Sequence, residues 1–106
     1  MSNILVNAPK TAKRDDVIEI KALIMHPMET GFRPGPNGRI IPRNIIERFS
    51  ATWNGTEIFA MDMSPAIAAN PFVSFFAKAN ESGTVVLRWT GDEGFAAEHR
   101  VDIAVE

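Results

Sequence analysis

Length, composition and charge exclude several classes of protein. The chain has 106 residues, 45% of them hydrophobic, which is typical of one folded domain and too apolar for a disordered segment. A formal net charge of −2, with scattered basic residues, argues against nucleic-acid binding, and the longest apolar stretch, residues 65–77, is too short to span a bilayer. The absence of cysteine excludes disulfides and thiolate chemistry.

The first fifteen residues are polar and show neither the apolar core nor the cleavage site of a secretory signal. We expect residues 1–15 to form a loose N-terminal arm and residues 16–106 to form the folded domain. Without a signal of its own, the protein either stays in the cytoplasm or leaves it with another chain.

A strand with one buried and one exposed face is predicted over residues 16–26. Its apolar positions alternate with polar ones and are Ile18, Ile20, Ala22 and Ile24. Pro27 ends this strand. Residues 27–39 are rich in proline and glycine, which predicts a long loop.

A β-hairpin is predicted next, because residues 44–53 and 56–63 flank Asn54-Gly55. This dipeptide is the strongest two-residue signal for a type I′ turn, in which both central residues need positive φ. A tight turn places Ala60 opposite Phe49 and makes Phe49 part of the core face.

The outer face of this hairpin is unusually apolar for a surface that meets water. It is predicted to carry Phe59, Met61 and Met63. The strand predicted over residues 72–79 also has two apolar faces, with Phe72 and Phe76 on the outer one. Such a patch exceeds what a monomer normally exposes and indicates a partner surface. A bulge that slips the register by one residue would exchange the two faces.

Two further strands are predicted over residues 84–90 and 96–105, each with alternating apolar and polar positions. No stretch has a sustained helical period. We therefore predict an all-β fold, an immunoglobulin-like antiparallel β-sandwich of about seven strands.

Catalysis is not expected, because no serine lies in a nucleophile-elbow motif and the chain has only two histidines. His99 is expected to be half-buried. His26 lies close to Met25 and Met28, and imidazole with thioether suits copper, so a histidine–methionine copper carrier with a sandwich fold is the alternative. Methionine is also a common core filler, and we expect no metal and no cofactor.

One run of residues is specific enough to suggest a family. Residues 24–31, Ile-Met-His-Pro-Met-Glu-Thr-Gly, followed by Ile-Pro-Arg at 41–43, resemble the SoxZ family of the sulfur-oxidising Sox system. Residues 70–75 and 86–89 are also similar to that family. The resemblance extends over roughly residues 16–105.

The resemblance implies a non-catalytic subunit that forms a heterodimer with SoxY. Sulfur intermediates of thiosulfate oxidation are held on the cysteine of the SoxY C-terminal arm, and the pair makes transient contacts with the Sox enzymes. It also implies a periplasmic location, reached by export together with the partner. Neither nucleic acid nor membrane is expected as a partner.

The parity of the strands, and not the resemblance, selects the expected partner interface. Its centre is predicted to be Phe59, Met61, Phe72 and Phe76. The start of the long loop is predicted to lie at its edge, with His26, Met28, Glu29, Thr30 and Gly31. No catalytic residue is assigned.

Overall fold

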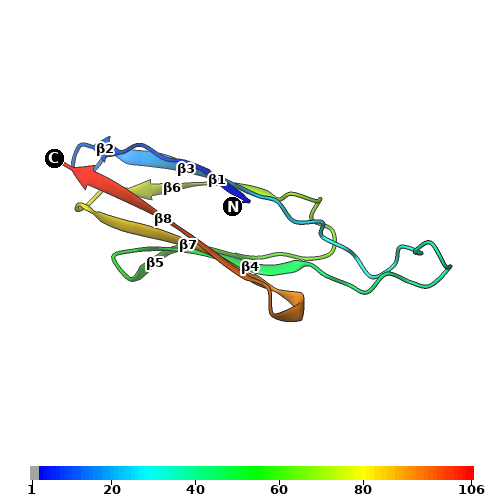
Figure 1. Ribbon diagram of the computed structural model, residues 1–106. Coiled ribbons are helices and arrows are strands. Elements are labelled where there is room, and N and C mark those ends of the chain that lie inside the picture. The colour runs from blue at the N-terminus through cyan, green and yellow to red at the C-terminus, as the bar shows by residue number, and fades with distance from the viewer. Residues whose placement is uncertain (1–2) are drawn as a thin grey trace.

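The computed structural model describes residues 3–106 as a sandwich of two β-sheets (Figure 1). The three-stranded sheet has the order β1-β3-β6, with β1 at Ile4–Asn7, β3 at Val17–Ile24 and β6 at Phe72–Lys78. The five-stranded sheet has the order β2-β8-β7-β4-β5. Its strands are β2 at Thr11–Ala12, β4 at Ile46–Trp53, β5 at Thr56–Asp62, β7 at Gly83–Gly91 and β8 at Ala96–Val105. A short 3-10 helix, η1, covers Asp92–Gly94 between β7 and β8.

This architecture confirms the predicted immunoglobulin-like sandwich. Neighbouring strands are antiparallel except that β2 runs parallel to β8. Within residues 3–106 no helix is long and apolar enough to cross a membrane.

The core lies between the two sheets, where the predicted alternations place their apolar side chains. The inward positions of β3 are buried as expected, and Ile20 and Ile24 are almost completely inaccessible to solvent. From the other sheet, Trp89 is fully buried and its ring lies 5.1 Å from that of Phe49, centroid to centroid. Burying a large apolar side chain contributes roughly 1.5–3 kcal/mol, so these layers supply most of the favourable free energy of folding.

The loose N-terminal arm predicted over residues 1–15 is wrong for the described part, residues 3–15. β1 pairs with β3, and its half-buried Ile4 and Val6 pack against the core, while β2 pairs with the end of β8. Each strand is too short to show a clear period in the sequence, so only pairing with a longer strand stabilises it.

The predicted hairpin forms, but its register shifts. Asn54 and Gly55 have φ of 51° and 86°, as a type I′ turn requires. A β-bulge then interrupts the pairing: Thr52 lies opposite Glu57, whereas Ala51 lies opposite Phe59. Ile58 is the extra residue, and every position of β5 beyond it faces the opposite way from the prediction.

Between β3 and β4 the chain leaves the sandwich as a projecting loop, which we define as residues 27–45. Figure 1 shows it in cyan and green, reaching well beyond the ends of both sheets. Two isolated antiparallel bridges hold it together, one between Glu29 and Asn44 and one between Pro34 and Ile40. The predicted loop is therefore an ordered, hairpin-like protrusion.

A candidate protein-binding face

Exposed apolar side chains gather on the outer face of the three-stranded sheet. Of the seven large hydrophobic residues that are exposed within residues 3–106, four belong to this sheet. They are Leu5 on β1, Val17 on β3, and Phe72 and Phe76 on β6. The predicted outward orientation of Phe72 and Phe76 is confirmed, with 60% and 65% of their surfaces exposed.

Strand register joins two of these positions, Leu5 and Phe72, into a row with the half-buried Leu23 of β3. Leu5 pairs with Leu23, and Leu23 pairs with Phe72, so one side chain from each strand lies side by side across the sheet. The row lines a shallow depression together with Val6, Asn7 and Lys21. Cross-strand neighbours of this kind form a continuous apolar surface.

The rest of this face carries a small polar network. The Ser74 hydroxyl donates a hydrogen bond of 2.6 Å to the Glu19 carboxylate, and the Lys21 ammonium lies 3.8 Å from the same carboxylate. Phe76 pairs directly with Glu19, so the aromatic ring lies beside this group. Apolar positions interleaved with hydrogen-bonding groups match the composition of protein–protein interfaces.

The outer face of the five-stranded sheet has a different character. It carries ion pairs, with Arg88 2.7 Å from Glu98 and Arg48 bonded to both Glu57 and Asp62. None of the seven exposed hydrophobic residues lies on β4, β5, β7 or β8. Charged side chains on this face are paired with one another, whereas exposed apolar side chains are concentrated on the three-stranded sheet.

The predicted outward positions of Phe59 and Met61 are wrong because of the β5 bulge. Both residues turn inward, and the Phe59 ring stacks on Phe75 of the facing sheet at 4.8 Å. Met63, placed on the same outer face by the predicted register, is also buried. The apolar surface that the sequence indicated is therefore supplied by β6 with β1 and β3, and not by β5.

His26 and Met28 are buried rather than positioned at the edge of an interface. The Met28 backbone N–H donates a 3.0 Å hydrogen bond to Nδ1 of His26, and the Ile46 N–H donates to the Met28 Sδ at 3.3 Å. The imidazole packs edge-on against Phe95. Burial lowers the pKa of His26 below its ordinary value, and the charge of Asp92 opposes this effect in part. Of the three side chains considered for copper, His26 and Met28 are therefore engaged in holding the start of the projecting loop, whereas Met25 is exposed.

Glu29, Thr30 and Gly31 are half-buried and build the base of the same loop. Glu29 exchanges two backbone hydrogen bonds of 2.8 Å with Asn44, and its carboxylate pairs with the Arg33 guanidinium, whose hydrogen bond lowers the pKa of Glu29. The Thr30 hydroxyl accepts a hydrogen bond from the Phe32 N–H. Gly31 has φ of +90°, and a Cβ there would lie 3.1 Å from Cβ of Arg43. The motif that marks the family in sequence is thus a structural junction.

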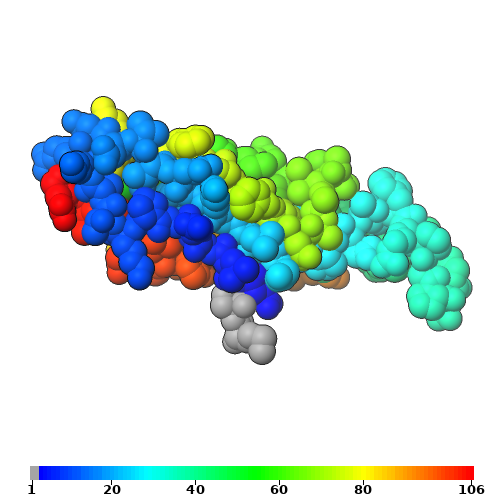
Figure 2. Space-filling view, turned by 90° about the horizontal axis from the view of Figure 1, so that it is seen from above, coloured from blue at the N-terminus to red at the C-terminus, as the bar shows by residue number. Residues whose placement is uncertain are grey.

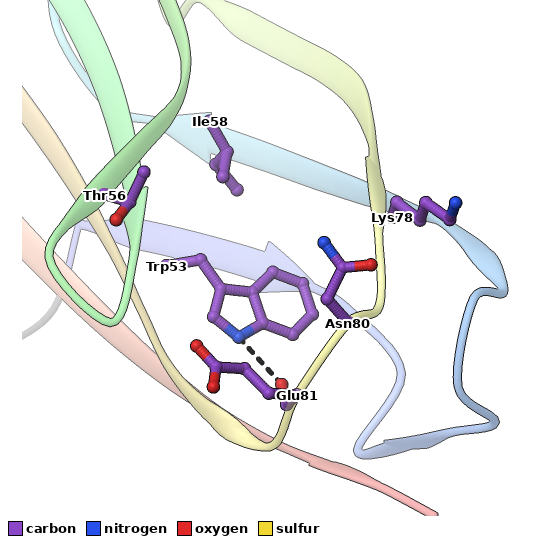
Figure 3. Close-up of a pocket in the computed structure, with 6 residues that line it drawn as sticks. All are labelled: Trp53, Thr56, Ile58, Lys78, Asn80 and Glu81. Atoms are coloured by element: carbon purple, nitrogen blue, oxygen red, sulfur yellow. Dashed lines mark hydrogen bonds between the residues drawn. The ribbon is translucent and has the colours of Figure 1, made fainter.

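A recess of about 190 Å³ lies where the β4–β5 turn meets the segment after β6 (Figure 3). Trp53 and Ile58 form its apolar wall, and the Trp53 Nε1–H donates a 3.0 Å hydrogen bond to the Glu81 backbone carbonyl. Small-molecule sites usually measure roughly 300–1,000 Å³. The recess is smaller, and Glu81 on its polar side is bonded to Trp53 and Asn54 of the β4–β5 hairpin.

The outer-face residues that sequence reasoning missed are Leu5, Val17 and Leu23. Leu5 lies in the segment predicted to be loose, although the run Ile4-Leu5-Val6 was a signal for a strand. Within residues 3–106, no group of three or more histidine, aspartate or glutamate side chains is placed to hold a metal ion. The predicted half-buried position of His99 is confirmed.

The two packed sheets define the class of the protein, an all-β sandwich domain of the immunoglobulin-like type, with exposed apolar side chains concentrated on one outer face. The family comparison is more specific. The model of the sulphur oxidation protein SoxZ matches residues 6–102, and the chain belongs to the SoxZ family. The resemblance in the sequence is thereby confirmed, and it connects the protein to the Sox sulfur-oxidation system.

Solved structures show the same fold at low identity. The sulfur carrier protein SoxY from Chlorobium limicola f thiosulfatophilum superposes with a TM-score of 0.70 at 13% identity, covering 100% of this chain and 81% of that one. A superoxide reductase (neelaredoxin) from Ignicoccus hospitalis gives a TM-score of 0.75 at 20% identity, covering 98% and 80%. Such identities show the fold alone. Among curated proteins no relative matches.

Proposed function

We propose that this chain is the non-catalytic subunit of a sulfur carrier and forms a heterodimer with a SoxY-like chain. In this arrangement the cysteine on the C-terminal arm of the partner holds the sulfur intermediates of thiosulfate oxidation. Membership of the SoxZ family supports the role. The chain has no cysteine of its own, so a thiol-bound intermediate requires a second chain.

The observation that carries the proposal is the apolar row on the three-stranded sheet. Leu5, Leu23 and Phe72 form a continuous surface, and Phe76 extends it along β6. Covering apolar surface contributes roughly 25 cal/mol per Å² removed from water. A partner that covers this face gains that free energy without displacing any of the ion pairs of the opposite sheet.

The proposal includes transient docking to the Sox enzymes and a periplasmic location, reached by export with the SoxY-like partner. Membership of the SoxZ family supports docking to the Sox enzymes, and the location is inferred from the resemblance alone. Cell fractionation in the presence and absence of the partner gene tests the second point: the chain is expected in the periplasm only when the partner is made. Periplasmic chain in the absence of the partner would contradict co-export.

Co-purification with the SoxY-like partner tests the interface. Phe72→Asp and Phe76→Asp are expected to abolish pairing, because each places a charge where the partner would remove water. Val86→Asp is the matched control, since Val86 lies half-buried on the outer face of the other sheet. Circular dichroism must show a β-rich fold for all three variants. Normal pairing by both phenylalanine variants would place the interface elsewhere.

A further inference from the structure

The projecting loop is ordered by its own contacts and by the sandwich. At its tip, the Gly35 N–H donates to the Arg39 carbonyl at 2.6 Å and the Ile41 N–H donates to the Arg33 carbonyl at 2.9 Å. At its root, the Arg43 guanidinium binds the Asp92 carboxylate through two hydrogen bonds of 2.8 and 2.7 Å. A protrusion that is already ordered loses little conformational entropy when a partner binds it.

The tip exposes side chains that the protein itself does not use. Phe32 has 82% of its surface exposed, the largest fraction among the large hydrophobic residues of the described part of the chain, and Ile40 has 56%. Arg39 forms no ion pair or side-chain hydrogen bond within residues 3–106. Phe32 and Arg39 are thus presented on one ordered loop, and aromatic and arginine side chains are enriched at the centres of protein interfaces.

The charge of the loop is opposite to that of the whole protein. Residues 27–45 contain three arginines and one acidic residue, in a chain of net charge −2. This excess is too small for a nucleic-acid surface, which needs a concentrated basic patch. It suits a limited number of carboxylates on a folded protein, where complementary charges speed association.

The loop and the apolar sheet face are separate surfaces. Figure 2 looks onto the three-stranded sheet and shows the loop, in cyan, extending beyond one end of it. The principal extents of 58 × 24 × 20 Å reflect this elongation. A chain that covers the sheet leaves the tip of the loop accessible, so both surfaces can be occupied at once.

We propose that the projecting loop docks the carrier onto an enzyme by inserting Phe32 into an apolar recess bordered by carboxylates, with Arg39 facing the carboxylates. The assignment rests on the proposed function, because it takes the enzyme to be one that acts on the partner-bound sulfur. It separates two contacts: the sheet face holds the permanent partner, and the loop makes the transient contact.

Binding of the intact heterodimer to each purified Sox enzyme, measured by surface plasmon resonance, tests the proposal. Phe32→Ser is expected to raise Kd for at least one enzyme by roughly tenfold or more. Arg39→Glu is expected to lower the association rate and to reduce its dependence on salt. Lys10→Glu, a charge reversal on an exposed residue beside β2 at the other end of the sandwich, is the control and should leave binding unchanged.

The outcomes separate the two proposals. A wild-type heterodimer that binds no Sox enzyme contradicts the proposed function, and so does failure of the heterodimer to form. Wild-type binding that Phe32→Ser and Arg39→Glu leave intact overturns only the assignment of the loop. Loss of pairing with the SoxY-like chain in these variants would also overturn it, because the loop would then belong to the permanent interface. Suppose instead that the heterodimer binds anionic phospholipid vesicles through Phe32, while Phe32→Ser leaves its binding to the enzymes unchanged. That result would overturn the assignment and identify a membrane surface as the target of the loop.

Discussion

The Phe59 and Phe75 rings stack across the sandwich with centroids 4.8 Å apart and planes inclined by 7°. Phe59 belongs to β5, at the edge of the five-stranded sheet, and Phe75 belongs to β6, at the edge of the three-stranded sheet. The contact therefore joins the two sheets on the side where no further strand pairs with either of them. It also fixes which face of β6 is free, since inward Phe75 leaves Phe72 and Phe76 outside.

Phe59→Ala is expected to lower the free energy of unfolding by about 2–3 kcal/mol, because a half-buried ring is lost and a cavity remains. Phe72→Ala in the isolated domain is expected to change it by no more than about 0.5 kcal/mol, because that ring is exposed. Urea denaturation measures both. Equal losses of unfolding free energy in the two variants would mean that Phe59 contributes no more to the core than the exposed Phe72.

Gly91→Ala is expected to destabilise the domain by about 2–3 kcal/mol or more. A Cβ at this position would lie 2.2 Å from the Ile45 carbonyl oxygen and 2.8 Å from Cα of Ile46, so backbone must move. Gly94→Ala is the comparison, because Gly94 has φ of +73° but open space around it, and only its conformational strain, about 1 kcal/mol, is expected. Thermal denaturation measures the two effects, and a larger decrease in Tm for Gly94→Ala than for Gly91→Ala would contradict this explanation.

Lowering the pH is expected to destabilise the domain through His26. The ordinary histidine pKa is 6.5, and burial lowers the pKa of His26 in the folded state. As the pH falls below 6.5, the unfolded chain takes up a proton that the folded chain does not, so the free energy of unfolding decreases. Protonation would also remove the Nδ1 lone pair that accepts the Met28 N–H.

Urea midpoints at about pH 7.5 and about pH 5.5 measure this effect. The His26→Gln variant is expected to be less stable at both values but to show a smaller decrease between them. An unchanged decrease in the variant would assign the pH dependence to other groups.

Arg43→Ala is expected to loosen the root of the projecting loop. The hydrogen bonds of Arg43 are the main reason that the pKa of Asp92 lies below its ordinary value, so the variant should shift that pKa upward. Because the folded pKa is lowered, the carboxylate stabilises the fold above its ordinary pKa of 3.8 and loses this effect as the pH falls through the folded value.

NMR measures both consequences of this substitution. The carboxyl titration reports the pKa of Asp92, and amide exchange of Ile45, whose N–H donates to the same carboxylate at 3.1 Å, is expected to accelerate. Arg48→Ala, which removes ion pairs on the outer face of the five-stranded sheet, is the control. Faster exchange at Ile45 in the control alone would contradict the proposed role of Arg43.

Sequence reasoning succeeded where a local pattern is long. The eight-residue alternation of β3 and the Asn54-Gly55 turn predict their elements correctly, because each depends on neighbouring residues only. β1 and β2 were not predicted, because strands of four and two residues are too short to show a clear alternation of apolar and polar positions. For Phe59 and Met61, the single extra residue Ile58 reversed a prediction that rested on strict alternation.

Patterns of residues were sufficient to establish the all-β class, the Asn54-Gly55 turn and the motif that resembles the family. The outward orientation of Phe72 and Phe76 was predicted correctly, but the orientation of the β5 side chains and the exposure of Leu5 depended on strand pairing. Only the tertiary structure united Leu5, Leu23 and Phe72 from three distant segments and buried His26 and Met28 at the root of a protruding loop. An alternating pattern indicates that a strand has two different faces, whereas packing against the facing sheet of the same chain determines which face is buried.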